Sequence, residues 1–244
     1  MNRQRFIALH GMLGDPADWQ PVADHVGGEW VALDLLDAIE AGAGSFDGFC
    51  RWLDEAVPAV AGVDDCLLGY SLGGRLALHA MVANSRRWQH VVIVSAHPGL
   101  ENDDEKVARV DADALWEDRF GDDALAWESA LRMWNAQPVL AGGGDDWVAG
   151  RMALESRRRA VAQAMRCWSL GRQQALWREL ERCELPCLWV AGAGDAKFAA
   201  LSGRASDLCR RGELALIDGV GHRVLHESPQ RFAALLRDWV ARIG

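Results

Sequence analysis

Residues 69–74 read Gly-Tyr-Ser-Leu-Gly-Gly, and they join a short apolar run to a segment with helical periodicity. The pattern Gly-x-Ser-x-Gly between a strand and a helix predicts a sharp turn that exposes the serine hydroxyl, here that of Ser71. Glycine at positions 69 and 73 lets two backbones approach closely, and the positive end of the new helix lies beneath the serine. The stretch therefore predicts a strand, a turn that carries a nucleophile, and a helix.

Short apolar runs alternate with helical patterns along much of the chain. The expected strands are residues 6–9, 30–35, 66–70, 91–96, 187–193 and 214–218, and the clearest helices are 46–60, 74–88 and 228–242. Continuous apolar character indicates strands that are buried on both faces, as in a parallel sheet. The alternation predicts an α/β doubly wound fold with a mostly parallel central sheet and flanking helices.

One long segment, residues 100–183, breaks the alternation because it shows only amphipathic helical patterns. A helical insertion at this point would lie over the C-terminal edge of the sheet, where open α/β sheets bind ligands. We therefore expect residues 1–99 and 184–244 to form the core and residues 100–183 to form a helical lid.

Composition excludes several classes of function. The chain has 244 residues, half of them hydrophobic, and its net charge of −9 argues against nucleic acid as a partner. No signal peptide precedes the first strand-like run, and no apolar stretch is long enough to span a bilayer. These features predict a cytoplasmic protein that binds no membrane. Nothing in the sequence indicates the oligomeric state.

Six cysteines are scattered along the chain, several of them inside apolar runs. We expect buried, reduced thiols rather than disulfides. Cys183 and Cys187 flank Glu-Leu-Pro, but no second cysteine pair or histidine pair completes a zinc site. We therefore expect no metal site at these cysteines.

Charge is distributed unevenly. Residues 101–123 are strongly acidic, whereas residues 151–172 contain six arginines against one acid, Glu155. These arginines either form a solvated helix face or line a pocket for an anion.

A serine nucleophile needs a base, which is itself oriented by an acid. Asp195 and His222 each follow an apolar strand, so both side chains are expected at the same edge of the sheet as Ser71. The order Ser, Asp, His is the order found in the α/β-hydrolase fold. Asp34 and Asp218 also end strands, but Asp34 precedes the serine and Asp218 is too close to His222. The sequence predicts a Ser71–His222–Asp195 catalytic triad.

The loop His10-Gly-Met-Leu-Gly14 follows the first strand, where this fold places one donor of the oxyanion hole. The second donor comes from the residue after the nucleophile. The expected donors are the backbone N–H groups of Met12 and Leu72, which are fixed in place before the reaction. His10 is expected to organise the loop rather than to act as a base.

Several further sequence motifs are more specific to one enzyme family than the Gly-x-Ser-x-Gly pattern. They are residues 10–15 (His-Gly-Met-Leu-Gly-Asp) with Trp19, 97–100 (His-Pro-Gly-Leu), 137–139 (Gln-Pro-Val), 194–198 (Gly-Asp-Ala-Lys-Phe) and 221–229 (Gly-His-Arg-Val-Leu-His-Glu-Ser-Pro). With these blocks the chain resembles the α/β-hydrolase superfamily throughout. Within it, the chain is most similar to the 2-succinyl-6-hydroxy-2,4-cyclohexadiene-1-carboxylate synthases, menaquinone-pathway enzymes that eliminate pyruvate from their substrate.

The resemblance implies a small anionic substrate with several carboxylates, and hence a pocket with fixed cations. Arg75 lies one helical turn after Ser71 and on the same face. Arg109 matches a substrate-binding arginine of the family's lid, and Trp134, just before Gln-Pro-Val, matches a pocket tryptophan. Tyr70 is also expected to contact substrate. No metal or organic cofactor is implied.

The resemblance also implies a role for the triad as a base. His222, oriented by Asp195, would activate Ser71 to remove a proton from the succinyl arm of the substrate. The Met12 and Leu72 amides would stabilise the carbanion, and pyruvate would leave. Two alternatives remain open. One is a carboxylic-ester or thioester hydrolase that forms an acyl-serine, and the other is a non-catalytic binding protein, which the intact triad disfavours.

The chain departs from the family in three places. Residues 34–40 read Asp-Leu-Leu-Asp-Ala-Ile-Glu where the family usually has a Pro-Gly-His-Gly turn. The antiparallel strands that commonly precede the first parallel strand are expected to be missing or reduced. The position of a second lid arginine aligns with Glu155. The residues that could replace this arginine are Arg151, Arg157, Arg158 and Arg159.

Overall fold

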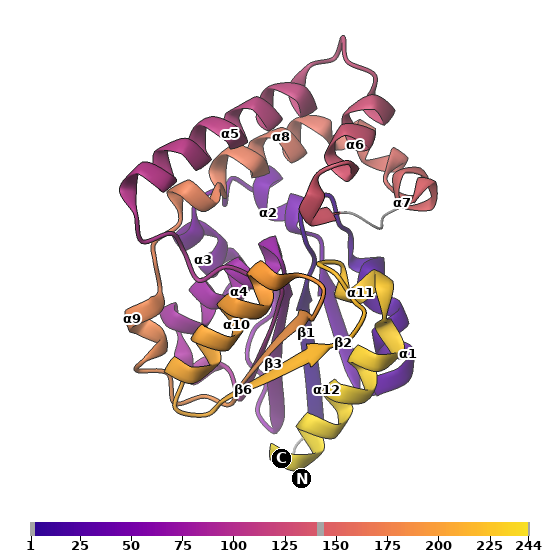
Figure 1. The fold of residues 1–244 in the computed structure, drawn as a ribbon. Coiled ribbons are helices and arrows are strands. Elements are labelled where there is room, and N and C mark those ends of the chain that lie inside the picture. The colour runs from indigo at the N-terminus through magenta and orange to yellow at the C-terminus, as the bar shows by residue number, and fades with distance from the viewer. Residues whose placement is uncertain (1–2, 141–143, 244) are drawn as a thin grey trace.

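A six-stranded sheet lies at the centre of the computed structural model, which describes residues 3–140 and 144–243 (Figure 1). The strand order is β2-β1-β3-β4-β5-β6, and every neighbouring pair is parallel. The strands are β1 (Arg3–Leu9), β2 (Glu29–Leu33), β3 (Val63–Tyr70), β4 (His90–Val94), β5 (Cys187–Gly192) and β6 (Gly212–Ile217). The predicted α/β fold is confirmed, and the described residues contain no antiparallel strand pair.

Helices connect the strands. Those of the core are α1 (Gln20–Val26), α2 (Leu35–Glu40), α3 (Phe46–Ala56), α4 (Leu72–Ala83), α10 (Ala196–Leu208), α11 (Val224–Glu227) and α12 (Pro229–Ile243). Between β4 and β5 lie α5 (Asp103–Gly121), α6 (Trp127–Asn135), α7 (Asp145–Gly150), α8 (Arg158–Cys167) and α9 (Trp177–Leu180). No helix in the described ranges combines the length and apolar character needed to cross a membrane.

Two helices end earlier than their periodicity predicts. The expected helix 46–60 stops at Ala56 because Val57 precedes Pro58, and a proline disfavours helical geometry in the residue before it. The expected helix 74–88 starts at Leu72 and stops at Ala83, where Asn84 adopts a φ of −147°. Similarly, β2 ends before Asp34, because the Asp34 carboxylate accepts a hydrogen bond from Leu36 N and so caps α2.

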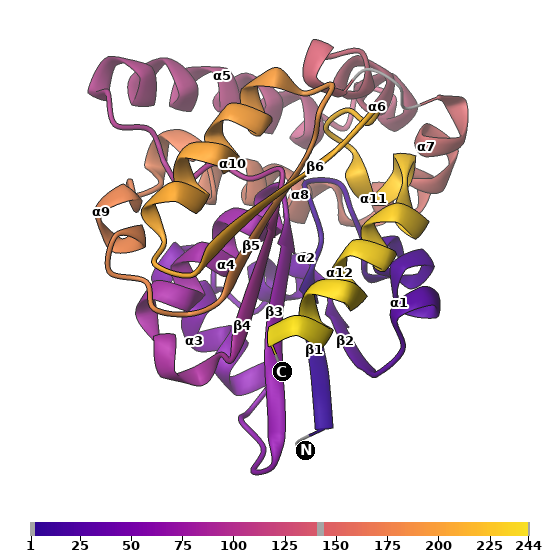
Figure 2. The ribbon, with the colours of Figure 1, turned by 60° about the horizontal axis from the view of Figure 1, so that its bottom comes forward.

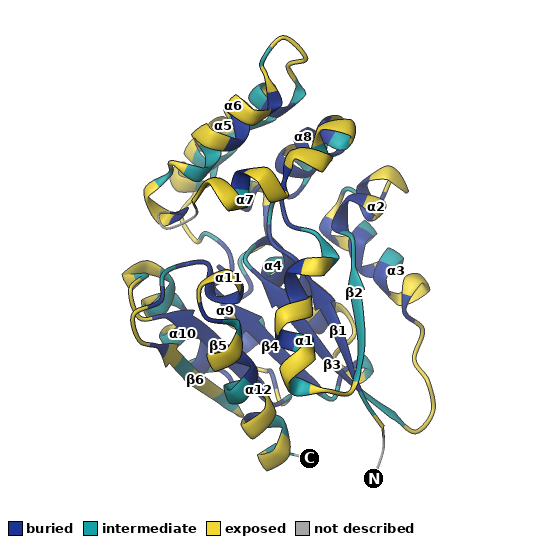
Figure 3. Cartoon of the chain, turned by 90° about the vertical axis from the view of Figure 1, so that its right-hand side faces the viewer, coloured by how far each residue is buried: buried dark blue, intermediate teal, exposed yellow. Residues whose placement is uncertain are grey.

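Helices cover both faces of the sheet, as Figure 2 shows. On one face, α1 and α12 bury an aromatic cluster that includes Trp19, Phe232 and Trp239. On the other face, α3, α4 and α10 pack over a second cluster that includes Phe49 and Leu76. Full burial of such side chains contributes on the order of 2 kcal/mol each. The four inner strands are largely buried, which explains their continuous apolar sequences (Figure 3).

The segment between β4 and β5 contains helices and loops but no strand among its described residues. Helices α5 and α8 run side by side beyond the carboxyl ends of the strands, and α6 and α7 lie next to them (Figures 1 and 2). Helix α9 instead returns to the side of the sheet, where it packs against α10. Helices α5 to α8 therefore lie over the edge of the sheet where Ser71 is found.

The turn at Ser71 joins β3 to α4 as the sequence predicts. Ser71 has φ 52° and ψ −108°, a conformation that costs a non-glycine residue about 1–3 kcal/mol. A Cβ atom on Gly73 would lie 2.2 Å from the carbonyl oxygen of Leu9, and one on Gly69 would lie 2.3 Å from that of Gly73. The two glycines are therefore required, because α4 begins directly against the backbones of β1 and β3.

Candidate active site

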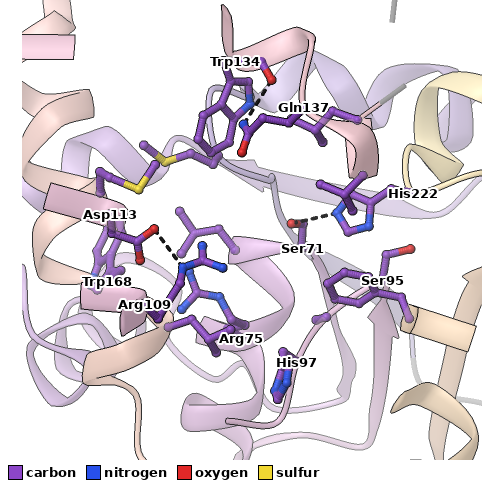
Figure 4. Close-up of a pocket in the computed structure, with 18 of the residues that line it drawn as sticks. Ser71, Arg75, Ser95, His97, Arg109, Asp113, Trp134, Gln137, Trp168 and His222 are labelled. Carbon is purple, nitrogen blue, oxygen red and sulfur yellow. Dashed lines mark hydrogen bonds and ion pairs between the residues drawn. The ribbon is translucent and has the colours of Figure 1, made fainter. Parts of the chain in front are cut away.

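A chain of two hydrogen bonds joins Ser71, His222 and Asp195 (Figure 4 shows the first of them). His222 Nε2 lies 3.2 Å from Ser71 Oγ, and His222 Nδ1 lies 2.9 Å from Asp195 Oδ2. Burial raises the pKa of Asp195, but hydrogen bonds from His222 and from the Phe198 N–H outweigh this effect and leave the pKa below its usual value. Asp195 is therefore a carboxylate at neutral pH and holds Nδ1 of His222 protonated.

Two loops at the carboxyl ends of β5 and β6 hold the acid and the base. Asp195 caps α10 by accepting a hydrogen bond of 3.2 Å from Phe198 N, which fixes the carboxylate. The loop that carries His222 is held by Glu227, whose carboxylate accepts the N–H groups of Gly221 (2.7 Å) and Arg223 (3.0 Å). Sequence reasoning did not identify Glu227 as a residue that positions the base.

The two alternative acids lie elsewhere. Asp218 is exposed. Asp34 interacts with Arg157 at 2.6 Å and lies 3.7 Å from His10 Nε2. Burial raises the pKa of Asp34, but the hydrogen bond from the Leu36 N–H and the positive charge of Arg157 favour the carboxylate, and the pKa is lowered to about 2. Asp34 thus stabilises the start of α2 and its contact with Arg157.

Asp34→Asn is expected to lower the free energy of unfolding by about 1.5 kcal/mol at neutral pH, because the depressed pKa reports favourable interactions of the charged form. This contribution is present above the pKa of the unfolded chain, near 4, and is lost as the pH falls toward 2. Urea unfolding between pH 3 and 8 measures it. Asp37→Asn, at an exposed partner of Arg157, is the control. A fall in kcat of more than about tenfold would instead place Asp34 in the chemistry.

His10 organises the loop after β1, as expected. Its Nε2 accepts the N–H of Leu35 at 3.0 Å, so Nδ1 carries the proton and donates to the carbonyl of Gly11 at 2.7 Å. The carbonyl of His10 accepts the N–H of Gly73 at 3.0 Å. These bonds fix the loop against α4, so that Met12 and Leu72 line the same cavity as Ser71. Leu72 is the first residue of α4, and its N–H has no acceptor within the helix.

The main cavity has a volume of about 200 Å³ and opens beside Ser71. Arg75 and Arg109 lie side by side in it, across from His222 (Figure 4). Arg109 Nε donates to Asp113 Oδ1 at 2.8 Å, and Ser169 Oγ donates to Asp113 Oδ2 at 2.7 Å. Asp113 thus orients Arg109 and balances its charge.

Arg75 has no carboxylate partner within the described part of the chain. Its Nη1 donates to the neutral Oε1 of Gln173 at 3.1 Å. Burial, together with the charge of Arg109, lowers the pKa of Arg75 to about 9, so the guanidinium remains charged at neutral pH. Burial also lowers the pKa of His97 to about 4, which keeps this neighbour neutral. With Lys197 at the rim, the cavity presents an excess of positive charge.

Trp134 lines the main cavity, as predicted, and packs edge-on against Trp116 with 5.0 Å between ring centroids. Tyr70 is placed differently from the other predicted substrate contacts. It lines a second, smaller cavity, which adjoins the first at Ser71. This second cavity is lined by Gly11, Met12, Leu13, Gly14, Asp18, Tyr70, Ser71, Trp134, Leu140, Trp147, Arg151, Arg223 and His226.

The four arginines considered as replacements for the expected second lid arginine have separate partners. Glu155 is exposed and lines neither of these two cavities. Arg157 binds the acids of α2, and Arg158 donates to the backbone carbonyls of Phe120, Asp122 and Leu125. Arg159 lies on the surface beside Asp123. Of the four candidates, only Arg151 lines either of these two cavities, and it lines the second one.

Sequence reasoning did not assign roles to several of the residues that line or support these cavities. Lys197, His97 and Arg223 stand inside the quoted sequence blocks, so a signal for them was present. Asp113 carries a different signal, because it lies four residues after Arg109 on the same helix, where opposite charges pair. Gln173 carries none, because its contact with Arg75 joins two segments that only the fold brings together.

All six cysteines are free thiols, and three of them form a cluster. The sulfur atoms of Cys183, Cys187 and Cys209 lie within 4.8 Å of one another, and Met81 Sδ lies 3.7 Å from Cys183 Sγ. Cys187 begins β5, so the cluster lies at the edge of the sheet opposite Ser71. The absence of a metal there stays a prediction, although the fold adds Cys209 to the pair considered from sequence.

The α/β-hydrolase fold is defined by a serine on a strand–helix turn of a parallel sheet. This serine is hydrogen-bonded to a histidine, which is hydrogen-bonded to a carboxylate, and both partners follow later strands. The chain therefore has an α/β-hydrolase fold. The sequence profile described as the alpha/beta hydrolase family matches residues 6–235. Comparison with curated relatives identifies the enzyme family within this fold. The chain belongs to the family of 2-succinyl-6-hydroxy-2,4-cyclohexadiene-1-carboxylate synthases within the alpha/beta hydrolases.

Two relatives with that synthase name illustrate the match. The protein of Serratia proteamaculans is 33% identical over 100% of this chain and 95% of its own length. The protein of Pectobacterium atrosepticum is 31% identical over 96% and 93%. Among solved structures, MenH from S. aureus superposes with a TM-score of 0.86 at 20% identity, covering 100% of this chain and 95% of its own. The Rhodococcus esterase RhEst1 superposes with a TM-score of 0.74 at 20% identity over 99% and 92%, which shows the shared fold.

Proposed function

We propose that this protein is a carbon–oxygen lyase that eliminates pyruvate from a polycarboxylate cyclohexene intermediate of menaquinone biosynthesis. The name of its relatives supports the pathway. The observation that carries the chemistry is the position of the Ser71–His222 pair beside a cavity that holds two adjacent guanidinium groups. A base next to fixed cations suits proton abstraction from a polyanion.

In this proposal Ser71 is the base that touches the substrate. His222 Nε2 accepts the Ser71 proton as Ser71 Oγ removes a proton from the ring carbon that carries the succinyl group, next to its carbonyl. Asp195 stabilises the resulting imidazolium through Nδ1. The electron pair left on the ring forms the second carbon–carbon double bond as the ring carbon–oxygen bond breaks. Pyruvate departs as its enolate, which takes up a proton to give the ketone. Each step conserves charge without a cofactor.

The carbanion next to the succinyl carbonyl places negative charge on that oxygen. Met12 and Leu72 line the cavity beside Ser71, and their N–H groups would donate to this oxygen. Donors held by the backbone need no reorganisation during the reaction. We assign the oxyanion hole to these two groups.

Arg75 and Arg109 would bind carboxylates of the substrate, with Trp134 as an apolar wall of the same cavity. Tyr70 contributes from the adjoining cavity. We further propose that residues 100–183 act as a lid over a core of residues 1–99 and 184–244, and that the enzyme works in the cytoplasm on a small anionic substrate.

The test is pyruvate release from the pathway intermediate, followed with lactate dehydrogenase and NADH. A panel of short-chain p-nitrophenyl esters and a thioester is run beside it. The proposal expects pyruvate release with little or no ester turnover. Ester or thioester turnover without pyruvate release would establish the hydrolase alternative in its place.

A further inference from the structure

Arg223, directly after the catalytic-site histidine, holds a buried charge without a partner. The residue is 3% exposed, and neither Nη1 nor Nη2 has a hydrogen-bond acceptor. Its guanidinium stacks over the ring of Trp147, 4.4 Å from the centroid. No carboxylate in the described ranges forms an ion pair with it. Burial of an unpaired guanidinium costs folding free energy, so its retention indicates that a ligand supplies the missing acceptor.

The groups around Arg223 leave its charge available. Arg151 lies across the same cavity, but it is already bound to Asp15 (3.2 Å) and to Asp18. Glu227 accepts the backbone N–H of Arg223 rather than its guanidinium. Burial lowers the pKa of His226, which also lines the cavity, so this ring is neutral at neutral pH.

The second cavity is small and lies beside the nucleophile. Its volume is about 40 Å³, against about 200 Å³ for the main cavity, and Ser71, Met12 and Trp134 line both. A ring with a succinyl arm requires the larger space. The smaller one accommodates a group of the size of a carboxylate, and Tyr70 lies in its wall.

We infer that Arg223 binds the carboxylate of the departing pyruvate in a second anion subsite, distinct from the one that Arg75 and Arg109 form. This inference rests on the proposed function. The product named for the relatives carries two carboxylates, one on the succinyl arm and one on the ring. Pyruvate carries a third, so the substrate that gives both products has three carboxylates. Two parallel hydrogen bonds from Nη1 and Nη2 match a carboxylate. Arg223, on the loop that carries His222, thereby supplies the positive charge that the family resemblance led us to expect at position 155, where this chain has Glu155.

The experiment measures pyruvate binding directly, so that it does not depend on turnover. Arg223→Met keeps an apolar stem over Trp147 and removes the charge, and Arg231→Gln, at an exposed arginine bonded to the carbonyl of Asp218, is the control. Pyruvate affinity is measured by isothermal titration and by the rise in Tm with pyruvate concentration. We expect at least a tenfold loss of affinity in Arg223→Met and none in the control.

Unliganded stability separates ligand binding from a structural role. Removal of an unpaired buried charge is expected to leave the Tm of unliganded Arg223→Met equal to that of the control variant or higher. Pyruvate affinity equal to that of the wild type overturns the inference, and so does a Tm below that of the control in both Arg223→Met and Arg223→Gln. If the methionine variant does not fold, Arg223→Gln takes its place with the same expected loss of affinity.

Turnover then separates this inference from the proposed function. If Arg223→Met loses pyruvate affinity but the wild-type enzyme releases no pyruvate from the intermediate, the carboxylate subsite stands and the lyase assignment falls. If the wild type releases pyruvate and Arg223→Met shows unchanged product inhibition by pyruvate, the lyase assignment stands and the subsite is overturned.

Discussion

Ser71→Ala is expected to lower kcat for pyruvate release by about 10³-fold, with KM changed by less than about threefold. The reason is that Ser71 Oγ is the group that takes the substrate proton, and the imidazole 3.2 Å behind it is too far from the carbon to replace it. The cations that bind the substrate lie elsewhere in the cavity, so binding persists. Steady-state rates of pyruvate release measure the effect.

A matched control is Ser206→Ala, which removes a buried hydroxyl of α10 that bonds only within its own helix. This variant should retain wild-type kcat. A Ser71→Ala enzyme with more than a tenth of wild-type kcat would remove Ser71 from the chemistry. Mass spectrometry of the wild-type enzyme during turnover adds a second readout, because the lyase route leaves Ser71 unmodified, whereas a hydrolase route adds an acyl group to it.

The core of the fold and the line of three side chains at the site follow from short-range sequence signals. Ser71, Asp195 and His222 each stand just after a buried strand, and parallel strands present their carboxyl ends at one edge. Gly69 and Gly73 indicated a close approach of two backbones, and the structure contains this approach. Such features are local, so a single sequence contains them.

The distribution of the lid arginines depends on contacts that no local pattern specifies. Residues 157, 158 and 159 are adjacent in sequence, yet one binds the acids of α2, one binds backbone carbonyls and one is exposed. A long side chain goes wherever an acceptor lies within reach, and the acceptors here belong to distant elements. The same argument applies to Arg223, whose burial depends on Trp147 in α7. The family resemblance therefore identified Arg75 and Arg109, but the sequence did not predict which of the other arginines would line a cavity beside Ser71.

Arg75→Gln is expected to lower kcat/KM for pyruvate release by about 100-fold, mainly through a higher KM. Arg75 has no carboxylate partner among the described residues, so its charge is available to the substrate. The charge of Arg109 is partly balanced by Asp113 at 2.8 Å, and Arg109→Gln should therefore have the smaller effect. Glutamine keeps a hydrogen-bonding group near Gln173, which limits the structural disturbance.

The control for Arg75→Gln is Arg86→Gln, an exposed arginine just beyond the end of α4 that lines neither cavity. It should retain wild-type kcat/KM.

Because the interaction is between charges, the difference in kcat/KM between Arg75→Gln and the wild type should also shrink as the salt concentration is raised. The double variant Arg75→Gln/Arg109→Gln tests whether both guanidinium groups bind the same carboxylate. If they do, the fold-loss of kcat/KM in the double variant is smaller than the product of the fold-losses in the two single variants. An Arg75→Gln enzyme with wild-type KM would show that the substrate's carboxylates bind elsewhere, and the anionic character of the main cavity's ligand would then have to be abandoned.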